Sequence, residues 1–349
     1  MLGLDARTAR ITWTVIVIAA VVGMLYVVRK TLFVFTLAVF LAYMIAPLVR
    51  RLDARRPTRV PHAVSVAAAF AIVIAAIAVF AAWIGPMITQ QSGELASELP
   101  RLMQKLDSEA LPLPQFLEPW RDRITLVLKQ SVEGATRSAV PFARGVVQAM
   151  TGLASNAVFV VLIPILAFLF LTDGAKLRNA VMRWLSPIGS ASTIDRVLTE
   201  LHEALGNYVR ALALLSLATF IAYTLFFSAT GVPFGVLLAA LAALLEFIPV
   251  IGPLTGAAIA VIVAVVAGYE HLLWIVGFFL AYRLFQDYVL MPKLMSGGIH
   301  VHPALVIFGF LAGEELAGIP GMFLSVPIMA TLVILLRATT PSAQRGKRS

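Results

Sequence analysis

Stretches of apolar residues alternate with shorter polar segments along this chain. Six apolar runs are each close to the ~20 helical residues that are needed to cross a bilayer. Two further stretches, 233–267 and 299–337, are equally apolar but are broken near the middle. The pattern predicts an all-α polytopic membrane protein with about eight membrane helices, including two broken or re-entrant hairpins. The six unbroken runs cover residues 11–28, 31–49, 62–84, 152–172, 211–230 and 272–290.

The composition supports a membrane protein and excludes several kinds of chemistry. Of the 349 residues, 60% are hydrophobic and 13% are charged, whereas soluble domains carry about 25% charged residues. The absence of cysteine excludes disulfides and thiolate metal sites. The sequence also has no Walker motif, nucleophile elbow or HExxH motif, so we expect neither an enzyme nor a bound cofactor.

The basic residues mark one side of the membrane rather than a nucleic-acid surface, although the net charge is +9. The link RRLDARRPTR (50–59) holds five arginines, as cytoplasmic loops do. Segment 88–150 holds seven basic and seven acidic residues, so we expect it outside, while 173–210 and the basic tail return inside. Arg29 and Lys30, in a predicted tight outer turn, depart from this pattern. Both termini are therefore expected in the cytoplasm, with the lipid bilayer and no nucleic acid as a partner.

The order of these segments predicts five regions. The polar regions before and after the fourth membrane helix show apolar residues at helical spacing, which is typical of amphipathic helices. They either lie on the bilayer or on the protein itself, or form an oligomer contact or an entrance vestibule. The regions are three N-terminal membrane helices (1–87), an extracytoplasmic amphipathic region (88–150), membrane helix 4 with a cytoplasmic amphipathic helix (151–210), a transport core (211–337) and a basic cytoplasmic tail (338–349).

The two broken stretches resemble one another. The first carries EFIPVIGP at 246–253 and the second carries GEELAGIPG at 313–321, so each places acid, an Ile-Pro pair and glycine inside an apolar segment. Each follows one full span after a short connection. The charge pattern places the start of the first hairpin outside and the start of the second inside. An inverted pair of span-plus-hairpin units is a recurring transporter plan, with the binding site where the broken helices meet.

A carboxylate beside helix breakers points to a site. Proline removes a backbone donor and glycine permits unusual turns, so the break frees backbone groups that must face protein or a wet cavity. A carboxylate there is costly unless it is paired, protonated or hydrated. The combination at Glu246 predicts an ion or polar-substrate site. The alternative is that Glu246 lies at a surface turn and merely caps a helix.

Other polar residues have competing interpretations. Asp287 either faces the same cavity as Glu246 or pairs with Arg283 one helical turn back. His300 and His302 lack a third ligand, so they are a weak metal signal and we predict no metal site. The candidate substrate- or ion-binding residues are Glu246, Pro249, Gly252, Pro253, Gln286, Asp287, Glu314, Glu315, Gly318 and Gly321.

Five stretches from residue 170 onward give the chain a specific resemblance to a known family. The resemblance is strong over residues 150–337 and rests on hydropathy alone before that. In their order and glycine-proline spacing, these stretches are similar to the AI-2E family of membrane permeases, also called autoinducer-2 exporter-like. They are FLTDGAKLR (170–178), NYVRALALL (207–215), GVPFGVLLAALAALLEFIPVIGPLTGA (231–257), QDYVLMPKLMSGGIHVHPALVI (286–307) and LAGEELAGIPGMFLSVPIMA (311–330).

The resemblance implies a multi-pass transporter of the bacterial inner membrane with about eight helices and no ATPase module. It also implies export of autoinducer-2, a quorum-sensing signal, or sodium/proton antiport, by a homo-oligomer that could be a pentamer. Two departures are visible: Ala211 stands where the family often has glycine, and Glu314-Glu315 adds acid where small residues are commoner.

The leading prediction is a secondary transporter or exporter that moves a small polar solute or exchanges Na⁺ and H⁺. Glu246 and the two hairpin tips would form the site, and Glu314 or Glu315 could carry a coupled ion. The alternative is a channel-like or scaffolding membrane oligomer without coupled transport. Ion-dependent flux in proteoliposomes separates the two, because a scaffold gives none.

Overall fold

The chain folds into helices that are joined by short turns. The computed structural model describes residues 6–107, 157–187, 189–248, 251–294 and 302–339, with the single positions 119, 123, 126 and 130. Over this part of the chain no strand is present, so the predicted all-α fold is confirmed. Five of its helices are long and apolar enough to cross a membrane, which makes this a polytopic membrane protein. They are Thr31–Ala54, His62–Glu98, Ala191–Thr230, Leu272–Leu294 and Gly321–Ala338.

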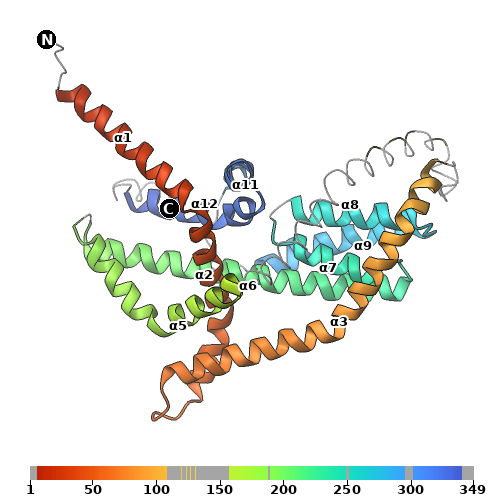
Figure 1. The fold of residues 1–349 in the computed structure, drawn as a ribbon, viewed down its shortest axis with the longest axis horizontal. Coiled ribbons are helices and arrows are strands. Elements are labelled where there is room, and N and C mark those ends of the chain that lie inside the picture. Colours follow the sequence, from red (N-terminus) through yellow and green to blue (C-terminus); the bar gives the residue numbers. More distant parts are fainter. Residues whose placement is uncertain are drawn as a thin grey trace.

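The helices follow one another in the order shown in Figure 1. Two of them, α7 and α8, are apolar but shorter than a full span, and they form the first hairpin predicted from the sequence. The bounds are α1 Ala6–Val27, α2 Arg29–Ala54, α3 His62–Asp107, α5 Ala157–Leu185, α6 Ala191–Thr230, α7 Gly235–Leu245, α8 Ile251–Val266, α9 Leu272–Phe285, the π-helical segment η2 Gln286–Leu290, α10 Met291–Leu294, α11 Pro303–Ala317 and α12 Ile319–Thr339.

The predicted tight turn at Arg29 and Lys30 is wrong. The amide of Val28 donates to the Met24 carbonyl at 3.0 Å, and the amide of Leu32 donates to the Val28 carbonyl at 2.9 Å. These bonds carry the chain from α1 into α2 without a reversal, and the two helices follow one another at an open angle in Figure 1. No glycine or proline stands at this junction to break the helical hydrogen bonding.

Two helices extend across region boundaries that were predicted from a change in polarity. Helix α3 continues without a break through residue 87, and α6 joins the amphipathic segment before Arg210 to the apolar span after it. The limits at 87 and 210 therefore mark changes of polarity inside continuous helices. Most of 88–150, including Pro112, Pro114 and Pro141, lies outside the described residues.

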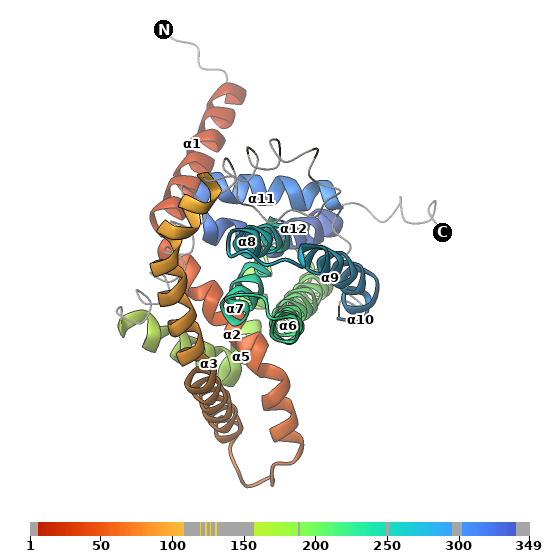
Figure 2. The ribbon, with the colours of Figure 1, turned by 90° about the vertical axis from the view of Figure 1, so that its right-hand side faces the viewer.

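The largest hydrophobic core joins α6, α7, α8 and α9, which lie side by side in Figure 1 and are seen end on in Figure 2. Phe227 is fully buried at its centre. Gly235 at the start of α7 faces Phe227, and a Cβ there would lie 2.7 Å from the Phe227 Cβ. Across the hairpin, a Cβ on Gly256 would lie 3.2 Å from the Ala242 Cα. Small residues thus let α7 pack closely on both neighbours, as in other membrane helix pairs.

Helix α3, which is distant from the hairpin in sequence, also contacts this core. The backbone amide of Leu237 in the first turn of α7 donates to the Oε1 atom of Gln91 at 2.9 Å. The first amides of a helix have no partner within that helix. Gln91 therefore completes the start of α7 from a position 146 residues earlier in the chain.

The second hairpin consists of α11 and α12 and turns at Gly318, whose φ is +60°. Its two helices approach at Gly313 and Gly321, where a Cβ on Gly313 would lie 2.4 Å from the Gly321 carbonyl oxygen. In Figure 2, α11 lies across the view while α6 to α9 are seen end on, so the two hairpins are crosswise. The inverted membrane orientation of the two units stays a prediction.

The two hairpins meet at the tip of the first one. The Phe247 ring lies 6.0 Å from the Phe323 ring of α12, and Phe323 in turn lies 5.0 Å from the Phe40 ring of α2. Phe310 of α11 is buried with Leu245 and Ile248. The break in the first hairpin is thus packed against the second hairpin and α2.

Candidate functional site

Glu246 is the first residue after α7, at the break in the first hairpin. Its amide donates to the Ala242 carbonyl at 3.1 Å, and the chain then tightens as the amide of Ile248 donates to the Leu245 carbonyl at 2.8 Å. The Glu246 side chain is 7% exposed, so it points into the protein and not to a surface turn. Pro249 lies outside the described residues.

Three neutral side chains surround this carboxylate. The Nε2 of Gln286 donates to its Oε1, and the Thr219 hydroxyl donates to its Oε2 at 3.4 Å. The Thr219 oxygen also lies 2.9 Å from the Tyr282 hydroxyl oxygen. A hydroxyl has one proton to donate, so when Thr219 donates to Glu246, Tyr282 donates to Thr219. The result is a chain of hydroxyls from α9 through α6 to the hairpin tip.

The Glu246 carboxylate has no cationic partner within this part of the structure. Thr219 is 1% exposed, Gln286 3% and Tyr282 8%, so the whole network is buried. Among the described residues, no Lys, Arg or His side chain lies within 4.0 Å of the carboxylate oxygens. Inside a membrane such a carboxylate is stable only when it is protonated, hydrated or bound to a cation. The oxygens of Glu246, Thr219 and Gln286 are ligands that hard cations accept.

A local change of helix type places Gln286 beside Glu246. Residues Gln286–Leu290 form a π-helical turn, in which the amide of Met291 donates to the carbonyl of Gln286, five residues earlier. Such turns occur mostly as single insertions in α-helices and are frequent at functional sites. The wider turn changes which side chains face the core, and it is Gln286 that is buried here while Asp287 is exposed.

The structure brings only some of the predicted residues together. Gly252 is buried at the start of α8, where a Cβ would lie 1.8 Å from the Leu245 carbonyl oxygen, so only glycine lets the chain return this closely. Pro253 is half-buried in the same turn. Asp287 pairs with Arg283 at 2.9 Å, as the alternative interpretation of this residue stated.

The acidic residues of the second hairpin lie away from this network. Glu314 and Glu315 are exposed near the end of α11. Gly318 makes the turn, and Gly321 is buried against Gly313. The second hairpin therefore contributes apolar contacts to the tip of the first one, whereas its two carboxylates face outward.

Thr219 and Tyr282 were not predicted from the sequence. Both are single polar residues inside apolar spans, and hydroxyls in membrane helices often bond only to their own backbone. The one available signal is that Thr219 and Tyr223 stand four positions apart on the same face of α6. The Tyr223 ring lies 5.3 Å from the Tyr282 ring.

The described residues contain no group of three or more His, Cys, Asp or Glu side chains that could hold a metal ion. The Nδ1 of His302 accepts a hydrogen bond from the Ala304 amide at 3.2 Å, so this side chain caps α11. His300 lies outside the described residues.

A buried carboxylate at the break of a membrane helix, held by neutral donors where two hairpins meet, is typical of helical membrane transporters. Comparison with known proteins agrees: residues 15–340 match the family described as AI-2E family transporter, and the chain belongs to it.

Relatives of the chain cover most of its length. It is 22% identical to YrrI of Bacillus subtilis (strain 168) over 89% of this chain and 87% of YrrI. It is 28% identical to AI-2 transport protein TqsA of Escherichia coli (strain K12) over 87% of this chain and 85% of TqsA. PerM of the same E. coli strain is 26% identical over 74% of each chain.

Proposed function

We propose that the protein is a secondary transporter in which Glu246 binds the coupling ion, Na⁺ or H⁺. The observation that carries the proposal is the buried Glu246 carboxylate, which is held by Gln286 and Thr219 without a cationic partner among the described residues. A proton and a cation compete for the same carboxylate oxygens. Their alternate occupancy of one site couples the two gradients, because only one can be carried at a time.

The network around Glu246 supports either ion. Tyr282 and Thr219 form a hydroxyl chain along which a proton can reach the carboxylate. The Thr219 hydroxyl and the Gln286 amide oxygen can turn toward a bound cation instead, since both groups offer oxygen ligands. Burial of a carboxylate such as Glu246 inside a membrane costs free energy, and such residues usually have a functional role.

The transported solute is proposed to be small and polar. One relative is named an AI-2 transport protein, and an autoinducer-2-like solute that moves outward in exchange for an inward-moving ion fits the same scheme. We place the protein in the bacterial inner membrane as a homo-oligomer, with both termini in the cytoplasm. The five arginines of the 50–59 link support a cytoplasmic position for that link.

Flux measurements in proteoliposomes test the proposal. Imposed Na⁺ and pH gradients should drive exchange by the wild type. Glu246→Gln keeps the shape and removes the charge, so it should abolish the Na⁺ and pH dependence while expression and oligomer size stay normal. Glu270→Gln is the matched control, because it makes the same chemical change at an exposed position between α8 and α9. Gradient-independent downhill flux in the wild type would favour a channel instead, and wild-type coupling in Glu246→Gln would reject the site.

A further inference from the structure

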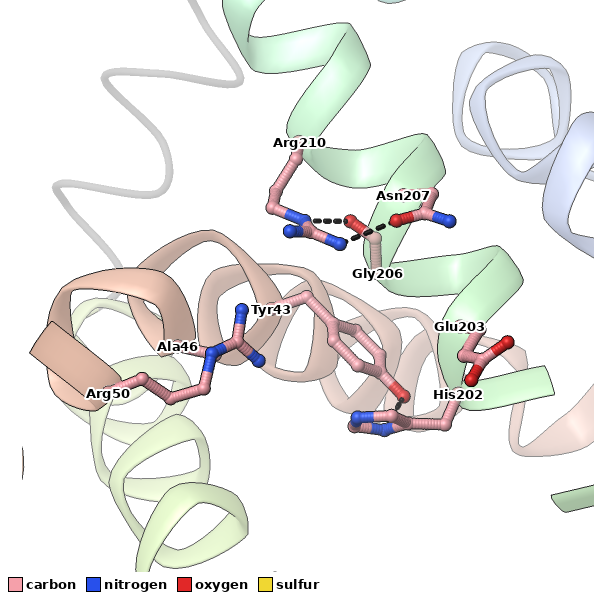
Figure 3. A pocket seen from close by; sticks show the side chains of 8 residues that line it. All are labelled: Tyr43, Ala46, Arg50, His202, Glu203, Gly206, Asn207 and Arg210. Atoms are coloured by element: carbon pink, nitrogen blue, oxygen red, sulfur yellow. Dashed lines mark hydrogen bonds between the residues drawn. The ribbon is translucent and has the colours of Figure 1, made fainter. Parts of the chain in front are cut away.

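A second polar site lies between α2 and α6, apart from the Glu246 network. The two helices line a partly open cavity of about 130 Å³, with Tyr43 and the exposed Arg50 on one side and His202, Gly206, Asn207 and Arg210 on the other. Figure 3 shows these side chains converging on one space. Arg210 comes about two and a half turns before Thr219 on α6, so the cavity and the proposed ion site share a helix but not a residue.

Gly206 keeps the side of the cavity next to Tyr43 open. A Cβ at this position would lie 3.3 Å from the Cδ1 atom of the Tyr43 ring, so a long side chain here would extend into the space. The walls are held by hydrogen bonds. The Tyr43 hydroxyl lies 3.0 Å from the Nδ1 of His202, and Arg210 donates from Nε to the Gly206 carbonyl at 2.9 Å. A second Arg210 nitrogen donates to the Asn207 amide oxygen at 2.5 Å.

Two guanidinium groups from different helices face this space. Among the described residues neither Arg50 nor Arg210 forms an ion pair within 4.0 Å. The carboxylate of Glu203 also borders the cavity, but Figure 3 shows it turned away from the two guanidiniums.

We propose that this cavity binds a phosphoryl group at the cytoplasmic face and thereby links α2 to α6. Guanidinium groups offer forked donors that match phosphate oxygens. Two forks from different helices, with the Tyr43 hydroxyl and the Asn207 amide nearby, surround a tetrahedral anion better than a planar carboxylate. The volume is several times the ~30 Å³ that a water molecule occupies in the liquid, which leaves room for such a group. The group belongs either to a soluble phosphate compound or to the head of an anionic lipid.

Binding to the purified full-length protein tests the proposal and separates the two sources. Inorganic phosphate and glycerol phosphate would be titrated in detergent with ³¹P NMR and calorimetry as readouts. Retention of phosphatidylglycerol over phosphatidylcholine from mixed nanodiscs would be measured by native mass spectrometry. Saturable binding in the first assay assigns a soluble ligand, and selective retention in the second assigns a lipid head. The absence of both overturns the proposal.

Variants decide whether the cavity is responsible. Arg50→Gln and Arg210→Gln should each weaken binding by about tenfold or more, as expected for loss of a charged hydrogen bond. Arg210→Lys keeps the charge without the fork and should restore part of it. Arg196→Gln is the matched control, because Arg196 lies on the same helix and pairs weakly with Glu200 at 3.9 Å. An equal loss in Arg196→Gln would show a diffuse charge effect and overturn the site.

Filling the cavity provides a test that leaves both charges in place. Gly206→Ala should weaken binding slightly and Gly206→Leu should abolish it, because the added atoms occupy the space beside Tyr43. Each variant would first be checked for wild-type oligomer size and thermal unfolding. Unchanged binding in a correctly folded Gly206→Leu protein would place the anion elsewhere and reject the cavity.

Discussion

At the scale of residues, the unusual feature of Glu246 is that hydroxyl and amide groups surround it. Sequence alone predicted that Glu246 is a site residue and that Asp287 could be a partner of Arg283, because acids beside helix breakers and charges one turn apart are local patterns. It could not predict Thr219 or Tyr282, since their meeting depends on how α6 packs on α9. The exposure of Glu314 and Glu315 likewise follows from packing and not from the local sequence.

Removal of the Thr219 hydroxyl should disturb the network with little change of shape. Thr219→Val should cost about 1 kcal/mol of unfolding free energy and should alter the pH dependence of flux, because Tyr282 is then cut off from Glu246. Thr224→Val is the control: this buried hydroxyl on the same helix has no hydrogen-bond partner among the described residues, so its loss should be neutral. Combined with Tyr282→Phe, Thr219→Val should show a non-additive effect on thermal stability and flux. Full additivity would argue against a connected chain.

Asp53, in the last turn of α2 and beyond the predicted span 31–49, should make stability depend on acid pH. A hydrogen bond from Ser65 lowers the pKa of Asp53, and the charges of His62 and Arg56 lower it further, while burial partly opposes them. The carboxylate also contacts the Nδ1 of His62 at 2.6 Å. A lowered folded-state pKa contributes stability above the ordinary aspartate value of about 3.9, and this contribution is lost as pH falls through the folded value.

Asp53→Asn should therefore unfold at a lower temperature than the wild type at pH 7. The difference in Tm should shrink steadily below about pH 4, because the unfolded wild type then binds a proton that the folded carboxylate takes up only at lower pH. Thermal unfolding of both proteins from pH 7 to pH 3 measures this. A constant difference down to pH 3 would contradict a role for the Asp53 charge.

At the scale of elements, breaks were predictable where the chain carries proline and glycine. Both hairpins were located from their Ile-Pro and glycine residues, whose backbone effects are local. The π-helical turn at Gln286–Leu290 was not, because its sequence QDYVL contains no breaker and Gln286 meets its partner Glu246 only in the folded chain. The continuation of α3 past residue 87 could not be predicted from polarity, because the helix carries on from apolar into polar sequence without a break.

The second hairpin should be sensitive to a single methyl group. In Gly321→Ala, the new Cβ would lie 1.9 Å from the Gly313 carbonyl oxygen, so α11 and α12 must separate. Overpacking of this kind costs about 1–3 kcal/mol or more, and the Tm should fall accordingly. Gly277→Ala in α9 is the control, since its Cβ would meet nothing within 4 Å. That variant should gain up to about 1 kcal/mol of helix stability. A similar Tm change in both would contradict close packing at Gly321.

At the scale of the whole molecule, much of the apolar surface faces outward. Trp274, Leu280 and Leu284 of α9 are each more than half exposed, which suits contact with lipid or with a second copy of the chain. How the helices are oriented across the membrane is set by charges in the loops and by the insertion machinery, and packing within one chain does not record it. The sequence is therefore the better guide to sidedness here.

Single cysteines can test the predicted sidedness, because the chain has no native cysteine. A membrane-impermeant maleimide applied to intact cells should label Glu270→Cys, between α8 and α9, and spare Lys293→Cys at the end of α10. Both positions are exposed in the structure. After the cells are broken, both should react. Labelling of both variants in intact cells would remove the basis for an inverted pair of hairpin units.

The bond between Gln91 and Leu237 bears on how this protein is made. The ribosome synthesises α3 before α7, so the Gln91 side chain lacks this hydrogen bond until the residues 146 positions downstream have been made. A fragment that starts at Ala211 would carry Glu246, Gln286, Thr219 and Tyr282 but would leave the Leu237 amide without the Gln91 side chain that accepts its hydrogen bond. Supplying residues 1–107 as a separate chain could meet that need. The residues of the proposed ion site are thus contiguous in sequence, yet the fragment that carries them should be less stable than the full chain because it lacks the α3 contact.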